Sequence, residues 1–419
     1  MSTDMQKTLP KGWKWVKLGD VAAKEKFAIR MGPFGSQLKK HELVNEGIKV
    51  LWIENIVNNK FEWLDNKCIT IDKFQVLKGF QVKHNDILTT TMGTIGRACV
   101  VPENIGKAII SSHLLKISPD LHIANPEFIS RYLSSDFCQK YFDKSSHGIV
   151  MKGLNTTIIK SLPVPFPPLP TQHKIVEILD EADNLRKLRQ QADEKMKDLI
   201  PSLFIKMFGD PMKNPKGWKV EKLRDIVNDN SDIVGGPFGS NLKVSDYREK
   251  GVPIIRLQNI DIGKFIEKDI KYITQDKAKE LSYHSYQPRD LILAKLGDPI
   301  GKTCLVPATM QSGIVVSDVV RIRVSPKKAN VKFILHALNS QYCASQLNKE
   351  TFGTTRPRVN LAEIRNLNIP LPPLSLQQEF AKIVEDIESE KARQAESRKK
   401  LDELFNCLMQ RAFTGELMA

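Results

Sequence analysis

The sequence lacks long apolar runs and metal-ligand spacing. No apolar stretch of the 419 residues approaches the ~18 residues that a membrane span requires. The opening segment, Met1 to Lys11, is too polar to hold the apolar core of a secretory signal. The eight histidines show no metal-ligand pattern. These absences exclude a transmembrane chain, predict that no secretory signal is present, and argue against a metalloenzyme.

Cysteine is sparse as well, and its six occurrences are widely spaced. The spacing excludes a zinc-finger pattern and a dense disulfide framework. Cys99 and Cys138 match Cys304 and Cys343 at a separation of 205 residues, which predicts small buried residues at equivalent core positions. A reducing cytoplasm is the expected setting.

Loops that bind cofactors are also missing. The segment Gly297 to Thr303 has one residue fewer between its glycines than a phosphate-binding loop needs. No glycine-rich loop for S-adenosylmethionine, no Asn-Pro-Pro-Tyr-type methylation motif and no Gly-x-Ser-x-Gly elbow occurs. Carboxylates beside lysines, as in Glu267 to Asp269, are too common to indicate a nuclease. We expect a binding protein whose chemistry, if any, belongs to a partner.

The chain does contain an internal repeat, whose two copies lie about 205 residues apart. Gly-Trp-Lys opens both halves, at Gly12 and Gly217. Gly32 to Ser36 (Gly-Pro-Phe-Gly-Ser) returns unchanged as Gly236 to Ser240. The period is too long for a solenoid, so we infer a duplicated, domain-sized unit with two similar sites.

Each half is predicted to be a mixed α+β domain followed by a long helix. Short β-like runs, such as residues 48–53, alternate with Gly, Pro and Asn turns, and short helical stretches follow, as near residues 126–142. The predicted globular domains and helical segments are, in chain order, 1–167 (domain), 168–211 (helix), 212–372 (domain) and 373–419 (helix).

Proline-rich segments stand where each domain meets its helix. Alternating prolines at 162–170 and 369–374 predict an extended, rigid hinge that cannot continue a helix. A docking motif for a proline-binding module is the less favoured alternative, because the segment recurs at the same junction in both halves. Thr171 and Ser375 follow as predicted helix N-caps.

The two predicted helices, over residues 171–208 and 375–412, have coiled-coil character. Their apolar residues recur at three- to four-residue spacing, interrupted in places by polar side chains. The simplest partner for each helix is the other one, packed antiparallel. Pro201 is predicted to kink or interrupt the first helix.

Charge is distributed unevenly between these parts. The net charge of +15 favours a polyanionic partner, either nucleic acid or an acidic membrane surface, over a basic protein without such a partner. The two helices together hold one more acidic than basic residue, so about +16 lies outside them, almost all on the globular units. Basic domains on a near-neutral connector favour a nucleic-acid reader on a scaffold.

Candidate DNA contacts are Gly-rich, basic or hydroxyl-bearing loops at repeat-equivalent positions. Glycine lets a backbone approach a duplex, Lys and Arg neutralise phosphates or bind guanine, and Asn and Gln can pair with adenine. For any single residue the alternative is a plain turn with a solvated side chain. The candidates are Gly35, Ser36, Gln37, Lys39, Lys40, Thr90, Thr91, Arg97, Lys152 and Asn155 in the first half, and Gly239, Ser240, Asn241, Lys243, Arg256, Lys295, Lys302, Arg356, Arg358 and Asn360 in the second.

The two halves differ where polar contacts are expected. Arg358 stands opposite Gly153, and Lys295 stands opposite Thr91. Scaffold positions are kept while these polar positions change. Such a pattern is expected if two copies of one fold read two different base sequences.

Taken in order, these motifs resemble the specificity subunit of type I restriction–modification systems. The resemblance is carried by Gly-Trp-x-x-x-x-Leu at the start of each half, by Gly-Pro-Phe-Gly-Ser, and by Pro-x-Pro-Pro-Leu-x-x-Gln, which ends at Gln172 and Gln377. It covers essentially the whole chain. No single motif is decisive, but their repeated order is specific.

The resemblance implies that domains 1–167 and 212–372 are target-recognition domains for double-stranded DNA. It implies that the helices form an antiparallel coiled coil with pseudo-two-fold symmetry, and that the DNA site is bipartite and asymmetric. It also implies two modification (methyltransferase) subunits and restriction (translocase/nuclease) subunits as partners. S-adenosylmethionine, ATP and Mg would then bind those partners, and this chain would be non-catalytic and metal-free, without a membrane partner.

Two alternatives from other classes stay open. The first is a stand-alone methyltransferase or nuclease with internal duplication, which methyl transfer from S-adenosylmethionine by this chain alone would reveal. The second is a coiled-coil adaptor without a DNA role, which absent or salt-insensitive DNA binding would support.

Overall fold

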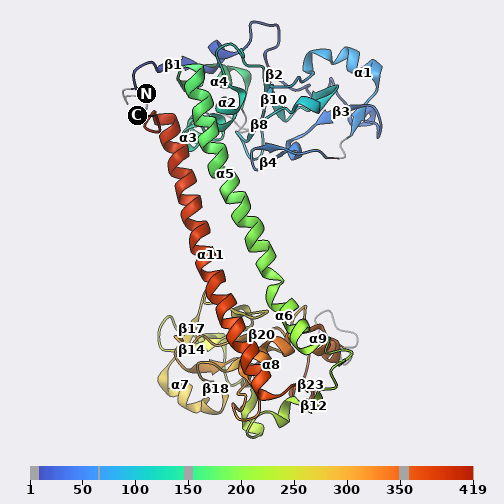
Figure 1. Cartoon of the computed structure of the whole chain (residues 1–419), viewed down its shortest axis with the longest axis vertical. Coiled ribbons are helices and arrows are strands. Elements are labelled where there is room, and N and C mark those ends of the chain that lie inside the picture. The colour runs from blue at the N-terminus through green and yellow to red at the C-terminus, as the bar shows by residue number, and fades with distance from the viewer. Residues whose placement is uncertain (1–8, 65–66, 146–153, 349–357, 419) are drawn as a thin grey trace. The chain divides into compact units, whose positions relative to one another are not determined.

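The computed structural model describes residues 9–64, 67–145, 154–348 and 358–418, and the chain forms two compact units (Figure 1). The first unit comprises Met1–Gln190 together with Glu396–Ala419, and the second comprises Gln191–Ala395. Both units are α+β, as the sequence predicts. Within the described ranges no helix has the length and apolar character needed to cross a bilayer.

The first unit is built on a four-stranded antiparallel sheet in the order β2-β10-β7-β8, with a three-stranded sheet, β6-β3-β9, beside it. Its strands are β1 (Lys14–Lys17), β2 (Ile29–Met31), β3 (Ile48–Leu51), β4 (Ile56–Val57), β5 (Lys60–Phe61), β6 (Cys68–Ile69), β7 (Ile87–Thr90), β8 (Ala98–Val100), β9 (Ala108–Ile110), β10 (Leu114–Ile117) and β11 (Pro163–Phe166). Its helices are α1 (Ile71–Val76), α2 (Pro126–Leu133), α3 (Asp136–Ser145), α4 (Thr156–Ser161) and the first part of α5 (Leu169–Lys197).

The second unit repeats this plan, with sheets β13-β22-β19-β20 and β17-β14-β21-β18. Its strands are β12 (Lys219–Lys222), β13 (Ile233–Gly235), β14 (Val252–Ile255), β15 (Ile260–Asp261), β16 (Lys264–Phe265), β17 (Lys271–Ile273), β18 (Ser285–Tyr286), β19 (Leu291–Ala294), β20 (Thr303–Leu305), β21 (Gly313–Val315), β22 (Val319–Ile322) and β23 (Asn368–Leu371). Its helices are α6 (Leu199–Phe208), α7 (Gln275–Glu280), α8 (Val331–Leu338), α9 (Gln341–Asn348), α10 (Leu361–Arg365) and the first part of α11 (Leu374–Thr414).

The central sheet of each unit is buried on both faces. Along β7, Ile87 joins the core under helices α2 and α3, whereas its neighbour Leu88 joins the core shared with the small sheet. Leu291 and Ile292 of β19 divide in the same way. Successive side chains of a strand point to opposite faces, so each central strand needs a continuous apolar run.

Asparagine caps start the equivalent helices α2 and α8. The Asn125 side chain accepts hydrogen bonds from the backbone nitrogens of Glu127 (2.9 Å) and Phe128 (3.2 Å). Asn330 does the same for α8. Such a cap stabilises a helix by about 1 kcal/mol. The prediction that the repeat-related cysteines are buried is confirmed for all four.

The proline-rich segments are extended, as predicted, over Pro163–Phe166 and Asn368–Leu371, where they are strands; the prediction is wrong for Leu169 and Pro170, which begin α5, and for Leu374, which begins α11. Residues of β11 pair antiparallel with β1, and residues of β23 pair antiparallel with β12. Each proline-rich segment is thereby tied to the Gly-Trp-Lys segment that opens the same unit. The pairing is possible because these two-stranded sheets leave an outer edge, where a missing N–H costs no ladder hydrogen bond.

The predicted N-caps are wrong, because α5 begins at Leu169 and α11 begins at Leu374. Thr171 and Ser375 therefore lie inside the first turns. Gln172 and Gln377, both fully buried, anchor the helices instead. Gln172 accepts a hydrogen bond from the Asn125 backbone nitrogen (2.8 Å) and donates to the carbonyl oxygens of residues 123 and 167.

The predicted interruption at Pro201 is present. Helix α5 ends at Lys197 and α6 begins at Leu199, so Pro201 is the third residue of the new helix. Its ring lacks an N–H and would collide with the carbonyl oxygen of Lys197 in a continuous helix. Helix α11, which has Asn406 at the equivalent position, is unbroken.

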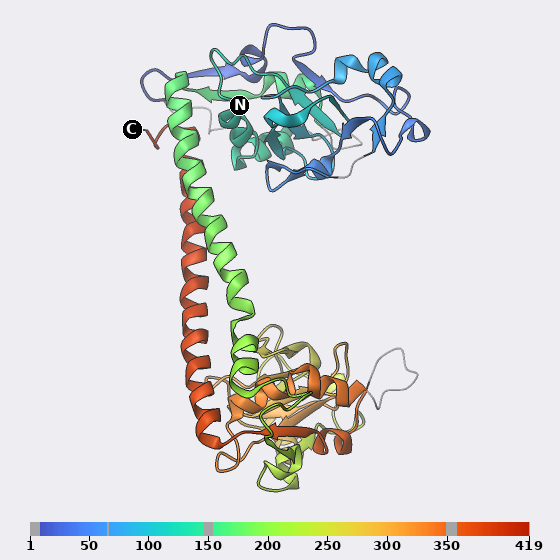
Figure 2. The same ribbon diagram turned by 45° about the vertical axis from the view of Figure 1, so that its right-hand side comes forward.

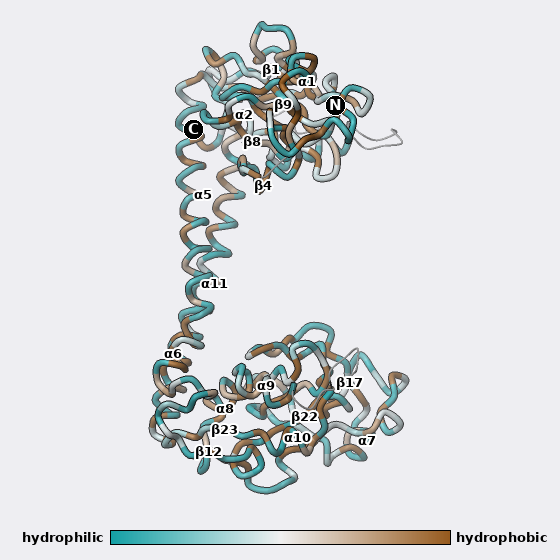
Figure 3. The backbone as a smooth tube through the Cα atoms, turned by 90° about the vertical axis from the view of Figure 1, so that its right-hand side faces the viewer, coloured by the Kyte–Doolittle hydropathy of each residue, from teal (hydrophilic) through white to brown (hydrophobic). Residues whose placement is uncertain are grey.

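Within the first unit, the start of α5 packs antiparallel against the end of α11 (Figure 2). Ile175 and Leu179 share a core with Ala412 and Phe413, whereas Arg186, farther along α5, donates to Asp402 at 2.7 Å. Apolar and polar residues alternate along both helices (Figure 3), as the predicted three- to four-residue spacing of apolar positions requires.

Candidate nucleic-acid interface

In the first unit, three predicted loops meet at one end of the central sheet, where strands β2 and β7 end, which we call the loop edge (Figure 1). Strands β2 and β7 both pair antiparallel with β10, so they run in the same direction and end at the same edge. Just beyond them, Gly32 N donates to Leu114 O (2.9 Å), Thr91 N to His113 O (3.0 Å), and Leu154 N to Thr91 O (3.1 Å). The loops after Gly32, after Thr90 and around Asn155 are therefore neighbours.

The second unit brings the equivalent loops together in the same way. Gly236 N donates to Val319 O (2.9 Å), and Lys295 N donates to Asp318 O (2.8 Å). Val359 N donates to Lys295 O (3.0 Å), which draws the segment before α10 to this edge. Figure 3 shows β22 and α10 in this unit. Residues more than a hundred positions apart thus form one loop surface.

Two glycines make these close approaches possible. A Cβ added at Gly32 would lie 1.8 Å from the carbonyl oxygen of Ser111, and one added at Gly236 would lie 2.0 Å from that of Val316. Backbone blocks both positions, so no larger residue fits without moving the sheet edge. The first glycine of Gly-Pro-Phe-Gly-Ser is therefore required by packing.

At the first edge, several predicted contact residues are exposed. They are Gly35, Ser36, Gln37, Lys39, Lys40, Arg97 and Asn155. Gln37 also shapes its own turn, because its side-chain oxygen accepts from Phe34 N at 3.0 Å. Asn155 caps α4 through Ile158 N at 2.9 Å. Arg97 stands at the start of β8, on the edge itself.

Thr90 and Thr91, by contrast, are buried. The Thr90 hydroxyl donates to Thr94 O and accepts from Arg97 N, and the Thr91 hydroxyl donates to His113 O at 3.0 Å. Both hydroxyls therefore hold the loop after β7 in place. Other residues of that loop form its surface, and Arg97 is the charged residue among them.

The second edge holds a compact group of charges. Arg358 is exposed and donates to Asp318 at 2.7 Å, while Lys295 is half-buried next to it. Burial, with a smaller contribution from Arg358, lowers the pKa of Lys295. Two cations share one carboxylate here, so an approaching phosphate would relieve their repulsion. Asn360 follows on the surface and caps α10.

The remaining second-half candidates are spread more widely. Gly239, Ser240, Asn241 and Lys243 are exposed in the loop after β13. Lys302 lies on the edge before β20 and pairs with Asp261 at 3.4 Å. Arg256 follows β14 of the other sheet and donates to Asp269 at 2.9 Å. Lys152 and Arg356 lie outside the described residues.

Two exposed aromatic side chains are missing from the predicted set. Phe34 is 66% exposed and Phe238 is 85% exposed, both within the repeated Gly-Pro-Phe-Gly-Ser. Sequence reasoning selected their neighbours as candidate contacts and assigned no role to the rings. A signal was available: an aromatic residue between a proline and a glycine, in a turn shortly after a β-run, has little to pack against.

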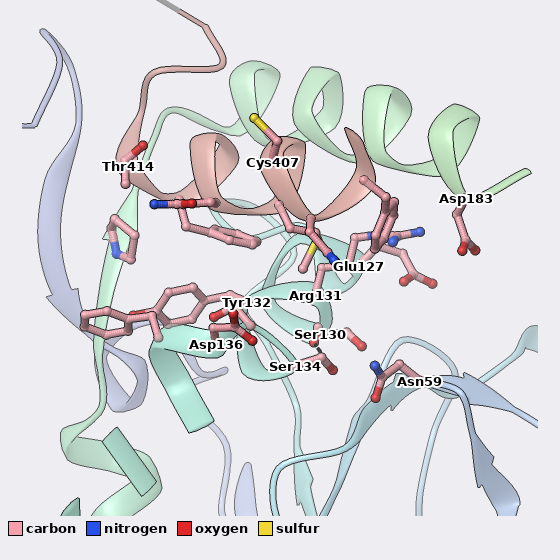
Figure 4. Close-up of a pocket in the computed structure, with 18 of the residues that line it drawn as sticks. Asn59, Glu127, Ser130, Arg131, Tyr132, Ser134, Asp136, Asp183, Cys407 and Thr414 are labelled. Carbon is pink, nitrogen blue, oxygen red and sulfur yellow. Dashed lines mark hydrogen bonds between the residues drawn. The ribbon is translucent and has the colours of Figure 1, made fainter. Parts of the chain in front are cut away.

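The first unit also contains a cavity of about 1230 Å³ that the sequence does not indicate (Figure 4). Helices α2 and α3, the β4–β5 turn, α5 and the end of α11 enclose it. Two ion pairs lie in its lining: Lys60 contacts Asp183 at 2.5 Å, and Arg131 contacts Asp180. Glu127 lines the same cavity, and burial raises its pKa. Across the described ranges no three His, Cys, Asp or Glu side chains gather as a metal site.

Comparison with known proteins was made on this framework. A family model described as the type I restriction modification DNA specificity domain matches the chain twice, over residues 10–197 and 215–403. The specificity subunit of the type I restriction enzyme MjaVIII of Methanocaldococcus jannaschii is 22% identical, over 98% of this chain and 94% of its own length. That of EcoBI of Escherichia coli is 29% identical, over 45% and 40%.

Solved structures share the fold. A chain from a study of complex assembly and conformational transition of the type I R-M system has a TM-score of 0.65 at 20% identity, covering 98% of this chain and 100% of that chain. The HsdS subunit from Thermoanaerobacter tengcongensis has a TM-score of 0.54 at 19% identity, covering 98% of both.

Proposed function

Because this chain belongs to the family of type I restriction–modification DNA specificity domains and carries two copies of that domain, we propose that it reads a bipartite DNA site. In this proposal each unit contacts one short stretch of double-stranded DNA through the loop edge of its central sheet. The two stretches differ in sequence, so the site is asymmetric.

One observation carries this proposal. In both units, loops from distant parts of the sequence converge on the same sheet edge, and they place basic and amide side chains there. The scaffold hydrogen bonds are equivalent, whereas Arg358 and Lys295 in one unit replace Gly153 and Thr91 in the other. Loops with equivalent backbone hydrogen bonds but different polar side chains suit the recognition of two different base sequences.

The connecting helices have a second role in the proposal. Helix α5 starts in the first unit and α11 starts in the second, so both chain connections between the units are helical. Their polar faces would bind two modification subunits, with restriction subunits added to these. S-adenosylmethionine, ATP and Mg would bind the partners, and this chain would be a non-catalytic cytoplasmic subunit.

The direct test is to map methylated adenines in a genome that carries this gene and its modification partner. A two-part motif with an unspecified spacer is the expected result, and it should disappear when this chain is deleted. Methylation that continues unchanged without this chain would contradict the proposal. So would methyl transfer by this chain alone.

Binding to DNA should also weaken steeply with salt. Several phosphates are neutralised in the proposed complex, and each released counterion contributes to the slope. Fluorescence anisotropy of the chain with its modification partner, at rising salt concentrations, measures the effect. A flat response would favour the adaptor alternative.

A further inference from the structure

The motif Gly-Pro-Phe-Gly-Ser is identical in the two units, but contacts within the chain explain only its first two residues. The leading glycine of each copy lies against backbone that leaves no room for a Cβ. The proline that follows, Pro33 or Pro237, is buried. These two residues fix where the loop leaves the sheet.

The other three residues have no such explanation. A Cβ added at Gly35 or Gly239 would meet nothing within 4 Å, and neither glycine has a positive φ, so alanine would fit at both positions. Ser36 and Ser240 are exposed. An exposed phenyl ring gains nothing from burial, yet both copies carry one. The identity of these residues points to a surface outside this chain.

The turn that carries the ring is fixed at both ends. Gln37 N donates to Phe34 O at 2.8 Å, and Asn241 N donates to Phe238 O at 2.8 Å. One residue later, Leu38 and Leu242 pack into the cores of their units. The phenyl ring therefore projects from a preformed turn, and little ordering of the backbone would accompany its binding.

An external surface that is the same for both units cannot be a specific base sequence, because the proposed half-sites differ. Sugars, phosphates and the faces of stacked bases are common to every duplex. These turns leave the sheet at the edge where Arg97 in one unit, and Lys295 with Arg358 in the other, gather positive charge. That charge favours DNA over an apolar protein surface as the partner.

Resting on the proposed function, we infer that Phe34 and Phe238 are sequence-independent apolar wedges that pack against the DNA duplex. Phenylalanine side chains can wedge against or between base steps without reading them. Gly35 and Gly239 let the backbone come close to the duplex, and the serine hydroxyls that follow can donate to phosphates. The two wedges would fix how each unit sits on DNA, while the neighbouring loops select bases.

The experiment uses this chain in complex with its modification partner. It compares Phe34→Ala, Phe238→Ala and the double variant, on a duplex with the recognised site and on an unrelated duplex. Each single change should weaken binding about tenfold on both duplexes, so that the ratio of the two affinities is unchanged. Leucine at either position should restore part of the loss. Leu121→Ala is the matched control, because Leu121 is 50% exposed and follows the opposite end of β10.

Three results would overturn the inference while leaving the proposed function intact. Weaker binding to the recognised duplex, with normal binding to the unrelated one, would make the ring a base reader. Normal DNA affinity with impaired assembly, seen by sedimentation, would make it a subunit contact. Normal affinity with normal assembly would leave it without a binding role. Failure of the unaltered complex to prefer the recognised duplex would instead refute the proposed function.

Discussion

The two units share a sheet plan but fill the space beside their outer helices differently. In the first unit, a cavity of about 1230 Å³ lies next to α2, α3 and the end of α11. In the second unit, the corresponding place beside α6, α8 and α9 holds only about 10 Å³. The same sheet topology is therefore compatible with a large cavity beside the helices and with close packing at the same place.

Four phenylalanine rings pack together at this place in the second unit. In the second unit the Phe208 ring lies 4.8 Å from Phe333 and 5.2 Å from Phe380, with Phe204 packed against all three. In the first unit, the repeat-equivalent residues of Phe204 and Phe380 are Met409 and Ile175. Two rings are thus replaced by smaller or more flexible side chains. The two units therefore share their sheet topology, whereas the side chains that the helices pack beside it differ.

The largest effect that tests this comparison is a core truncation. Phe380→Ala should destabilise the second unit by about 4 kcal/mol, because the ring is fully buried among three others. Ile175→Ala, at the equivalent position in the first unit, should cost about 3 kcal/mol there. Hydrogen exchange of α8 and of α2 reports the two units separately. Equal losses of unfolding free energy in the two units would mean that the aromatic cluster adds no stability beyond that of aliphatic packing.

The second test concerns acid. Burial lowers the pKa of His336 to about 4 from an ordinary 6.5, with Glu388 opposing this and Lys332 and Lys391 adding to it. Between these pH values only the unfolded chain binds the proton. The free energy of unfolding should therefore be highest above pH 6.5 and fall by about 3 kcal/mol as the pH approaches 4.

The equivalent position in the first unit is Arg131, which contacts Asp180. His336→Met should therefore flatten the pH dependence of the second unit, measured by denaturant unfolding with exchange of α8 as the readout. An unchanged slope in the variant would show that another group titrates.

The third test compares the two buried glutamines. Gln172 makes three hydrogen bonds to backbone groups, and Gln377 makes two, with Asn330 N and Pro372 O. Gln172→Ala should cost about 3 kcal/mol and Gln377→Ala about 2 kcal/mol, because each leaves unsatisfied groups behind. Thermal unfolding measures the difference. A larger loss for Gln377→Ala would reverse the ranking.

The smallest test addresses recognition. Arg358→Ala should weaken binding to the cognate site by about 2 kcal/mol and relax only the half-site read by the second unit. The same outcome is expected for Arg356, which lies outside the described residues. Binding to duplexes altered in one half-site at a time measures it. Equal loss at both half-sites would indicate a folding defect.

Much of the fold follows from local pattern. The apolar runs of β3, β7, β14 and β19 and the position of the break before Pro201 could be predicted, because each depends on neighbours in sequence. The pairing of β1 with β11 could not, because a proline-rich segment carries no sign of its partner. The anchoring role of Gln172 was hidden for the same reason, since the groups that it satisfies are 47 and more residues away or precede the helix.

The candidate site shows the same limit. Loop composition selected segments that the fold brings together at one end of each central sheet, because repeat-equivalent loops follow equivalent strands. It did not separate Thr90 and Thr91, which are buried, from Arg97, which is exposed, since hydroxyl residues suit a strand end and a DNA contact equally. It also passed over Phe34 and Phe238, whose exposure depends on what the rest of the fold leaves uncovered.

The core of the first unit contains Ala412 and Phe413, near the far end of the sequence, whereas the second unit is continuous from residue 191 to residue 395. During translation, the ribosome therefore releases everything that the second unit needs before the first unit can close. The unit whose synthesis starts first is therefore the last to complete its core. Until the end of α11 emerges, α2 and α5 expose the apolar face that Ala412 and Phe413 cover, and a chain cut before Ala412 would leave the core of the first unit open.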